Sequence, residues 1–299
     1  MKPVIGLIGP GAMGLGMTRA LLRGGFDVLV RDIDPARDAL AHAAGAEVCA
    51  TPQAIAARTD IVISVVVDAV QTDAIVFGRD GLADALPVGG IVVMCSTVGP
   101  AYARDLATRL AGRGIVLVDA PISGGPVRAE AGTMSMMISG PAAALTRCDP
   151  AFRAMSDKRF VISEAPGDGS TMKLVNNLLA AVNLVAGAEA FALAQRAGLD
   201  LARVHEVVQA SSGASWMIGD RMKRVIDDDH TVAAAMPILT KDVRLAVEMA
   251  HQLGARAELG ARAHAALQAG VDMGLQHEDD AWVIRTYLTH VADLPDGKR

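Results

Sequence analysis

The chain has 299 residues, which is enough for two domains of ordinary size. Hydrophobic residues make up 52% and charged residues 20%, a balance typical of globular proteins and unlike that of disordered chains. The formal net charge is −5, and no basic run is interleaved with aromatic residues, so composition argues against nucleic acid as a partner.

The cysteines and the apolar runs favour the cytoplasm. Cys49, Cys95 and Cys148 lie far apart without CxxC spacing, which predicts neither a zinc site nor disulfides. The seven histidines show no metal-ligand spacing either, so we expect no metal. No uninterrupted apolar run reaches the roughly 18 residues of a membrane span, and the N-terminus lacks the apolar core of a secretory signal. We therefore expect a cytoplasmic protein without a membrane partner.

In chain order, the first elements read as strand, glycine turn, helix and strand. The run PVIGLIG (3–9) is short and apolar, as expected of a strand that is buried on both faces. A helical pattern follows at 15–23, and the apolar run 26–30 ends at Arg31-Asp32. This order predicts the first unit of a dinucleotide-binding domain.

Glycines at positions 9, 11 and 14 fit the pattern G-x-G-x-x-G, with Ala12 and Met13 between the last two. Such spacing allows a tight turn and close approach of the backbone to a pyrophosphate, which the N-terminus of the following helix stabilises. Asp32 is placed to accept hydrogen bonds from the adenosine ribose, and its carboxylate would repel a 2′-phosphate. We therefore expect NAD rather than NADP, although Arg31 and Arg37 are nearby cations. The alternative is a glycine-rich turn beside an ordinary solvated aspartate.

Further apolar runs at 60–67, 90–97 and 114–121 alternate with helical stretches, which predicts a doubly wound parallel sheet over residues 1–164. Ligands of such sheets bind beyond the carboxyl ends of the strands. Val66, Val67, Ser96 and Thr97 fall there as candidate cofactor contacts. Cys95 falls there too, as a small buried hydrophobic residue rather than a nucleophile.

The stretch VDAPISGGPVRAEAGTM (118–134) follows the last of these strands. It places Ser123, Gly124 and Gly125 in an expected loop at the same sheet edge. Glycine has no Cβ, so a loop of this kind exposes its backbone amides to a ligand.

A long helical pattern runs from Thr171 to Gly198 without proline, and Gly198 suits its C-terminal cap. Every later segment reads helical, so we expect an all-helical second domain over 165–299 that opens with a helix long enough to link two domains. Lys173 and Asn177 are four residues apart and share one face of that helix. Spacing alone leaves open whether Lys173 is a solvated lysine or a functional one.

Four motifs in order resemble those of the β-hydroxyacid dehydrogenase family over nearly the whole chain. GLIGPGAMGLGM resembles the family's cofactor motif, and DAPISGGPVRAEAGTM its substrate motif. GDGSTMKLVNNLL resembles its catalytic motif, and TKDVRLA (240–246) a later motif whose lysine reaches the cofactor. The segments SWMIGDRM (215–222) and EDDAWVI (278–284) are most similar to the branch that acts on four-carbon sugar acids.

The resemblance implies a role for each motif. Lys173 would be the general acid/base on the substrate hydroxyl, with Asn177 positioning both the lysine and the hydroxyl. Since a lysine near its reference pKa of about 10.4 is a poor base, desolvation should lower that pKa. Ser123 and the amides of Gly124 and Gly125 would hold the substrate carboxylate. Lys241 would lie near the nicotinamide, and its alternative is one member of a surface ion pair with Asp242.

The expected reaction is NAD-dependent oxidation of a small hydroxy acid, with a four-carbon sugar acid such as L-threonate as the first substrate. 3-Hydroxyisobutyrate dehydrogenase and tartronate semialdehyde reductase are the alternatives among enzymes, and a non-catalytic NAD-binding regulator is the alternative outside them. An imine reductase would lack the lysine.

Some expectations concern the helical half alone. Trp216 either lines the substrate pocket or anchors the core. The acidic runs 227–229 and 278–280 are expected to be solvated helix ends. A long apolar helix favours a homodimer or homotetramer, because a partner subunit would cover it.

Overall fold

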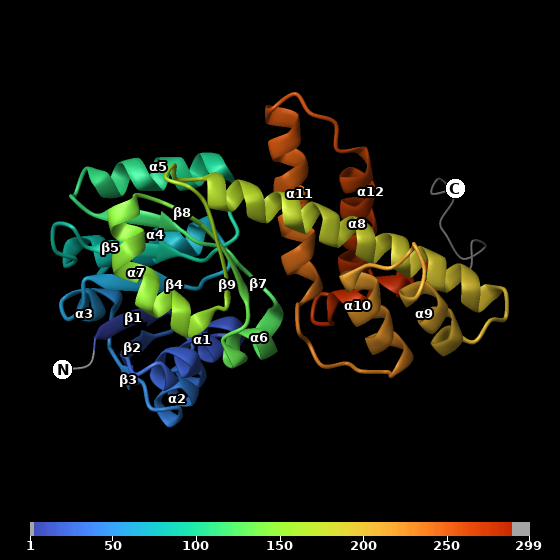
Figure 1. Ribbon diagram of the computed structural model, residues 1–299, viewed down its shortest axis with the longest axis horizontal. Coiled ribbons are helices and arrows are strands. Elements are labelled where there is room, and N and C mark those ends of the chain that lie inside the picture. Colours follow the sequence, from blue (N-terminus) through green and yellow to red (C-terminus); the bar gives the residue numbers. More distant parts are fainter. Residues whose placement is uncertain (1–2, 289–299) are drawn as a thin grey trace. The chain divides into compact units, whose positions relative to one another are not determined.

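The computed structural model describes residues 3–288, so the outermost ends of the two expected domains lie outside the described residues. The chain divides into two compact units, Met1–Lys173 and Leu174–Arg299. The first unit is built on one sheet, and the second consists of helices (Figure 1).

The sheet unit carries nine strands in the order β3-β2-β1-β4-β5-β6-β8-β7, with β9 paired to β8. The strands from β3 to β6 are parallel, as expected. Their bounds are β1 Val4–Ile8, β2 Asp27–Arg31, β3 Glu47–Val48, β4 Ile61–Ser64, β5 Ile91–Met94 and β6 Val116–Asp119. The order reverses on either side of β1, which is the topological switch point where such sheets bind ligands.

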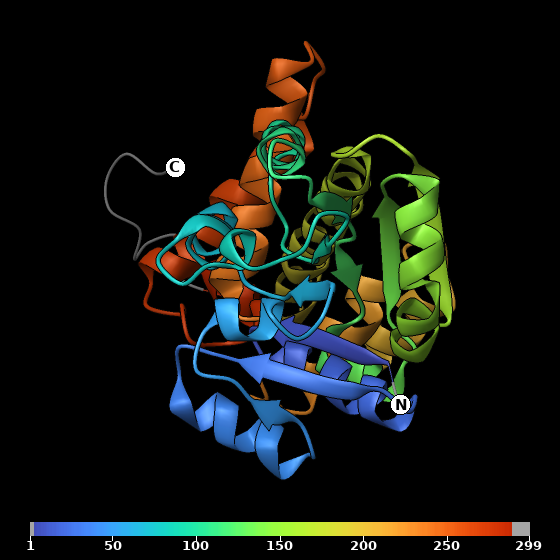
Figure 2. The same cartoon turned by 90° about the vertical axis from the view of Figure 1, so that its left-hand side faces the viewer.

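The central strands read as continuous apolar runs because both faces of the sheet are covered. In β4, Ile61 and Ile63 belong to one hydrophobic core, and Val62 between them belongs to the other. Helices lie on both sides of the strands (Figure 2). Residues of α1 Ala12–Arg23, α2 Pro35–Ala43, α6 Gly125–Ala131 and α7 Ala142–Met155 contribute to the first core. Residues of α3 Pro52–Ala56, α4 Ala69–Phe77, the 3₁₀ turn η1 Leu82–Asp84 and α5 Pro100–Ala111 contribute to the second.

The predicted parallel sheet continues at its far edge with strands that include antiparallel pairs. Three further strands, β7 Ile122–Ser123, β8 Ser135–Ser139 and β9 Lys158–Ser163, complete the sheet. The β6–β8 and β7–β8 pairs are antiparallel. β7 is only two residues long, too short for a pattern to identify it. β9 carries the apolar run Phe160-Val161-Ile162, but all three side chains are exposed, unlike those of the central strands.

The second unit is helical throughout its described part, as expected. Its elements are α8 Asp168–Arg196, which starts in the first unit, then α9 Leu201–Gln209, α10 Trp216–Ile226, α11 Met236–Gln252, α12 Glu258–Asp272, η2 Asp280–Ile284 and α13 Arg285–Leu288. After α8, Gly198 has a positive φ of 77°. The amide of Leu199 donates to the carbonyl of Ala194, and that of Gly198 to Gln195, which is the Schellman arrangement.

Although polar residues interrupt its apolar run, α8 is long and apolar enough on average to cross a membrane by length and composition alone. It has 29 residues, and its most apolar window has a mean hydropathy of 1.6, with 44% of that window buried. The buried residues of α8 explain the composition, because Leu184, Ala188 and Phe191 belong to the core of the helical unit. A core helix of a globular protein passes the same test.

Candidate functional site

The loop between β1 and α1 is held against the ends of two neighbouring strands. Gly9 has a φ of 90°, and its amide donates to the carbonyl of Arg31 at 3.0 Å. A Cβ on Gly9 would lie 2.6 Å from the carbonyl oxygen of Val65, and one on Gly14 would lie 2.1 Å from that of Gly9. Both positions therefore exclude any side chain, which is the physical reason for glycine there.

The N-terminus of α1 has the properties of an anion site. Its N-cap is Gly11, which supplies no side-chain hydrogen bond to the first turn, and nothing lies within 4 Å of a Cβ built there. Ala12 is exposed and Met13 is half-buried. The first amides of a helix have no partners within it and carry a partial positive charge. These residues fit the pyrophosphate of a dinucleotide.

Asp32 follows β2 directly, beside the glycine loop. One of its carboxylate oxygens, Oδ1, accepts a hydrogen bond from the amide of Asp34 at 2.9 Å. Ile33 is 89% exposed and supplies no charge. This carboxylate is suited to the ribose hydroxyls of NAD.

The other expected cofactor contacts differ in exposure. Val66 is half-buried next to Gly9, and Val67 is 48% exposed. Ser96 is buried, and its hydroxyl lies 3.2 Å from that of Thr72, so it already has a partner within the protein. Thr97 is half-buried. Cys95 is buried as expected, and burial raises the pKa of its thiol far above the ordinary value.

The expected glycine loop at 123–125 is shorter than the sequence suggests. Ser123 belongs to β7 and pairs with Ser135, and α6 already begins at Gly125. Only Gly124 lies between the two elements, with a φ of 133° that side chains rarely adopt. Gly125 has no atom within 4 Å of a built Cβ, so the space beside it is open.

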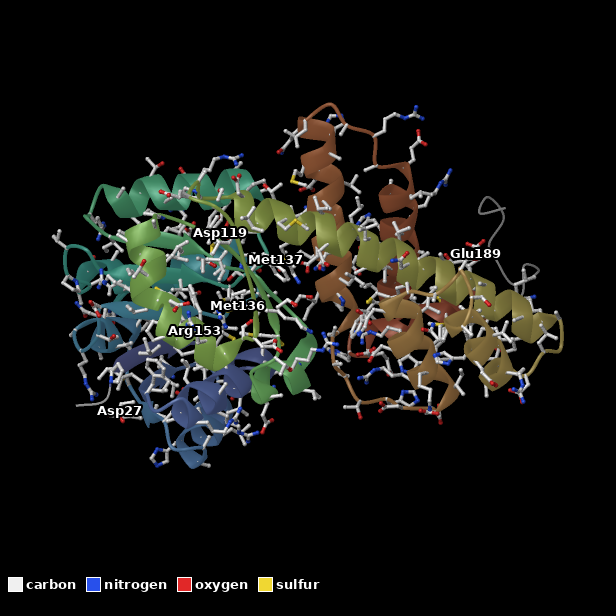
Figure 3. The ribbon with its side chains drawn as sticks, in the orientation of Figure 1. Asp27, Asp119, Met136, Met137, Arg153 and Glu189 are labelled. Atoms are coloured by element: carbon white, nitrogen blue, oxygen red, sulfur yellow. The ribbon has the colours of Figure 1, made fainter. Side chains whose placement is uncertain are left out.

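Asp119, the last residue of β6, anchors the start of α8, a role that its sequence position does not predict. It is fully buried, and one carboxylate oxygen accepts from the amides of Gly167 at 3.1 Å and Ser170 at 2.8 Å. The other oxygen accepts from the Ser170 hydroxyl at 2.8 Å. Burial raises the pKa of Asp119, against these hydrogen bonds. Asp119 lies in the sheet near the start of α8 (Figure 3).

Lys173 follows this anchored turn and is only 7% exposed. Asn177, four residues later, is also 7% exposed. The burial of both side chains is consistent with the prediction that they share one face of the helix. Lys173 is therefore not a solvated lysine at the start of a helix.

Asn177 connects to the later lysine motif within the helical unit. Its Nδ2 donates to Oδ2 of Asp242 at 2.6 Å, and Oδ1 of Asp242 lies 2.8 Å from Nζ of Lys241. The side chain of Asp242 is 4% exposed and that of Lys241 is 18% exposed. Lys241 and Asp242 do form an ion pair, but it does not lie on the surface, because both side chains are largely removed from solvent and Asn177 also contacts Asp242.

Two expectations for the helical half need correction. Trp216 is 53% exposed at the start of α10, so it is not the core anchor; that position belongs to Trp282, which is 7% exposed. Asp279 and Asp280 are buried rather than solvated, and both face Arg221, at 3.5 Å for Asp279. One guanidinium lies beside both carboxylates, a contact that forms only in the folded chain and that no local pattern signals.

Two protein-family models match consecutive parts of the chain. Residues 4–163 match the family described as the NAD binding domain of 6-phosphogluconate dehydrogenase. Residues 167–287 match the family described as NAD-binding of NADP-dependent 3-hydroxyisobutyrate dehydrogenase.

Similar proteins span nearly the whole chain. An L-threonate dehydrogenase of Cupriavidus necator is 38% identical over 96% of this chain and 97% of its own. An NAD-dependent L-serine dehydrogenase of Pseudomonas aeruginosa is 32% identical over 87% of this chain and 89% of its own. The crystal structure of a 3-hydroxyisobutyrate dehydrogenase from Salmonella typhimurium superposes with a TM-score of 0.89 at 36% identity, covering 95% of this chain and 99% of that one. The chain therefore belongs to the β-hydroxyacid dehydrogenase family and is an NAD-binding oxidoreductase that acts on the CH–OH group of hydroxy acids.

Proposed function

We propose that the protein oxidises a four-carbon sugar acid, with L-threonate as the first candidate, and reduces NAD in the same step. The Cupriavidus necator relative, which is 38% identical, is named L-threonate dehydrogenase, and we transfer that substrate to this chain. The observation that carries the catalytic part is the buried Lys173 on the anchored first turns of α8, with Asn177 on the same face.

The chemistry follows from what alcohol oxidation requires. When bound, the nicotinamide accepts a hydride from carbon, and the hydroxyl must lose its proton in the same reaction. We assign that proton transfer to Lys173 as general base, and as general acid in the reverse direction. Asn177 is a positioning residue, because its amide is held by the buried Asp242.

The substrate carboxylate is assigned to Ser123 and the amides of Gly124 and Gly125. Support comes from the open space beside Gly125. Trp216 keeps its proposed role as a substrate contact, since half of its surface is exposed. Lys241 keeps its proposed role toward the cofactor.

Cofactor contacts are assigned to Gly9, Gly11, Ala12, Met13 and Gly14 for the pyrophosphate. Asp32 is assigned to the adenosine ribose. Val66, Val67 and Thr97 are assigned to the rest of the dinucleotide. The geometry of the glycine loop supports the first of these assignments.

The remaining proposals concern organisation. We propose domains over 1–164 and 165–299, supported by family matches that end at 163 and resume at 167. We propose a homodimer or homotetramer, because Leu179 and Leu193 of α8 are 60% and 69% exposed. We propose the cytoplasm, because all three cysteines are free and buried. Light scattering of the purified protein tests the oligomer.

The decisive experiment measures NADH formation with L-threonate, 3-hydroxyisobutyrate, L-serine and other small hydroxy acids. We expect L-threonate to have the highest kcat/KM. A preference for 3-hydroxyisobutyrate would replace the substrate and keep the reaction. The absence of turnover with every acid, with NAD binding retained, would favour a regulator.

Lys173→Ala tests the catalytic assignment. We expect kcat to fall by about 10²–10⁴-fold, the usual contribution of a general acid/base, with the Kd for NAD unchanged. Lys158→Ala is the matched control, because Lys158 is an exposed lysine on β9 of the same unit. An equal loss of NAD affinity in Lys173→Ala would show that the lysine has another role.

A further inference from the structure

The chain contains two arginines beside the candidate ribose site, and either could accept a 2′-phosphate. Arg31 is the last residue of β2, directly before Asp32, and Arg37 lies on α2. A guanidinium in this position is how dinucleotide-binding sites accommodate NADP. Asp32 alone therefore does not settle the cofactor.

The structure contains a carboxylate that holds the first arginine. Nη1 of Arg31 lies 2.7 Å from Oδ2 of Asp38, one turn into α2. The same Nη1 also donates to the carbonyl oxygen of Asp32. The side chain of Asp38 is 11% exposed and that of Arg31 is 30% exposed, so solvent screens this pair less than a surface pair.

The second oxygen of Asp38 contacts the backbone of the same turn. Oδ1 of Asp38 accepts a hydrogen bond from the amide of Asp32 at 2.7 Å. One buried carboxylate thus neutralises Arg31 and fixes the backbone from which the Asp32 side chain projects. Both effects disfavour a phosphate at the 2′ position of the ribose.

The second arginine is engaged more weakly. Nε of Arg37 lies 3.8 Å from Oδ2 of Asp34, and both side chains are about half exposed. An exposed pair at that distance contributes little. Arg37 is therefore available whatever Asp38 does, whereas the availability of Arg31 depends on its buried partner.

We infer that Asp38 is a positioning residue for cofactor selection: it holds Arg31 away from the 2′ position, so that the protein binds NAD in preference to NADP. The inference rests on the proposed ribose site at Asp32. Asp38 lies outside the glycine motif and would act through the side chain of Arg31.

Asp38→Asn tests this inference with little change in shape. The amide oxygen of asparagine can still accept from the backbone of Asp32, but the ion pair to Arg31 is lost. We expect the Kd for NADP, measured by calorimetry without substrate, to fall about tenfold, which is the size of one charge-assisted hydrogen bond at a half-exposed site. The Kd for NAD should stay within about twofold.

The double variant Arg31→Ala/Asp38→Asn identifies the route. If Arg31 carries the gain, the double variant binds NADP no better than Arg31→Ala alone. A gain that persists without Arg31 would overturn the inference, since the cause would then be loss of negative charge in general. Asp60→Asn is the matched control, because it removes the same charge at the opposite, amino end of the strands and should leave both Kd values unchanged.

Two outcomes separate the inference from its premise. If Asp32→Asn lowers NAD affinity while Asp38→Asn leaves NADP affinity unchanged, the ribose site stands and the role of Asp38 is wrong. If Asp32→Asn has no effect on either cofactor, the ribose lies elsewhere and the inference is overturned with its premise. Because every readout is binding, failure to identify the hydroxy-acid substrate does not affect the test.

Discussion

Replacing Asp119 tests whether the sheet positions the catalytic helix. Asp119→Ala would leave the amides of Gly167 and Ser170 without the acceptor that the buried carboxylate supplies. Ser170 lies in the first turn of α8 and Gly167 directly precedes that helix, so no preceding helical turn offers either amide a carbonyl. Lys173 lies three residues after Ser170, so the turn that loses its anchor is the one that positions the proposed general base.

The size of the effect follows from the bonds lost. Each buried donor left without a partner costs about 1–3 kcal/mol. Two backbone donors give about 2–5 kcal/mol, since some water would enter the space left by the side chain. Asp119→Asn should recover much of this loss, because its amide oxygen can accept from both amides. Ser170→Ala removes only the hydroxyl bond and should cost about 1 kcal/mol.

Three measurements check this prediction. Urea unfolding gives the stability of each variant, and hydrogen exchange of residues 167–171 reports the first turn directly. Under the proposed mechanism, kcat falls in both variants, and it falls less in Asp119→Asn than in Asp119→Ala. The Kd for NAD stays unchanged, because the glycine loop is untouched. Equal stability of the alanine and asparagine variants, or unchanged exchange at Ser170, would refute the reasoning.

Three further predictions concern groups outside the site. The free thiols should not react with Ellman's reagent at pH 8 until the protein is unfolded, because burial raises their pKa, to about 12 for Cys148; reaction of the native protein would contradict this. The hydrogen bond to Glu278 raises the pKa of His230 above its ordinary 6.5, and its ring stacks on Trp282 with centroids 4.3 Å apart. Trp282 fluorescence should therefore decrease as the pH falls through that raised pKa. The stabilisation that protonated His230 contributes should be lost as the pH rises through the same pKa. A fluorescence titration that His230→Ala leaves unchanged would exclude His230 as its origin. Arg221→Met should destabilise the protein by about 3–5 kcal/mol in urea unfolding, because Asp279 and Asp280 would keep their burial and lose their counter-charge; a loss below 1 kcal/mol would mean that water replaces it.

The sequence by itself determined the parts of this protein that local rules govern. The apolar runs of β1, β4 and β5 are strands because both faces are buried, and glycine is required at positions 9 and 14 by backbone contact. The Schellman end of α8 at Gly198 is equally local. Motif order was sufficient to identify the family.

Tertiary structure decided what depends on partners distant in sequence. β7 is too short to show a strand pattern of its own, and both β7 and β9 join the sheet by pairing with β8. Asp119 reads as one residue of a motif, and only the fold brings it to the amides of α8. Asp38 reads as a helix-surface acid until Arg31 is placed beside it. Charge neutralisation in the interior depends on distances in space, which residue spacing does not encode.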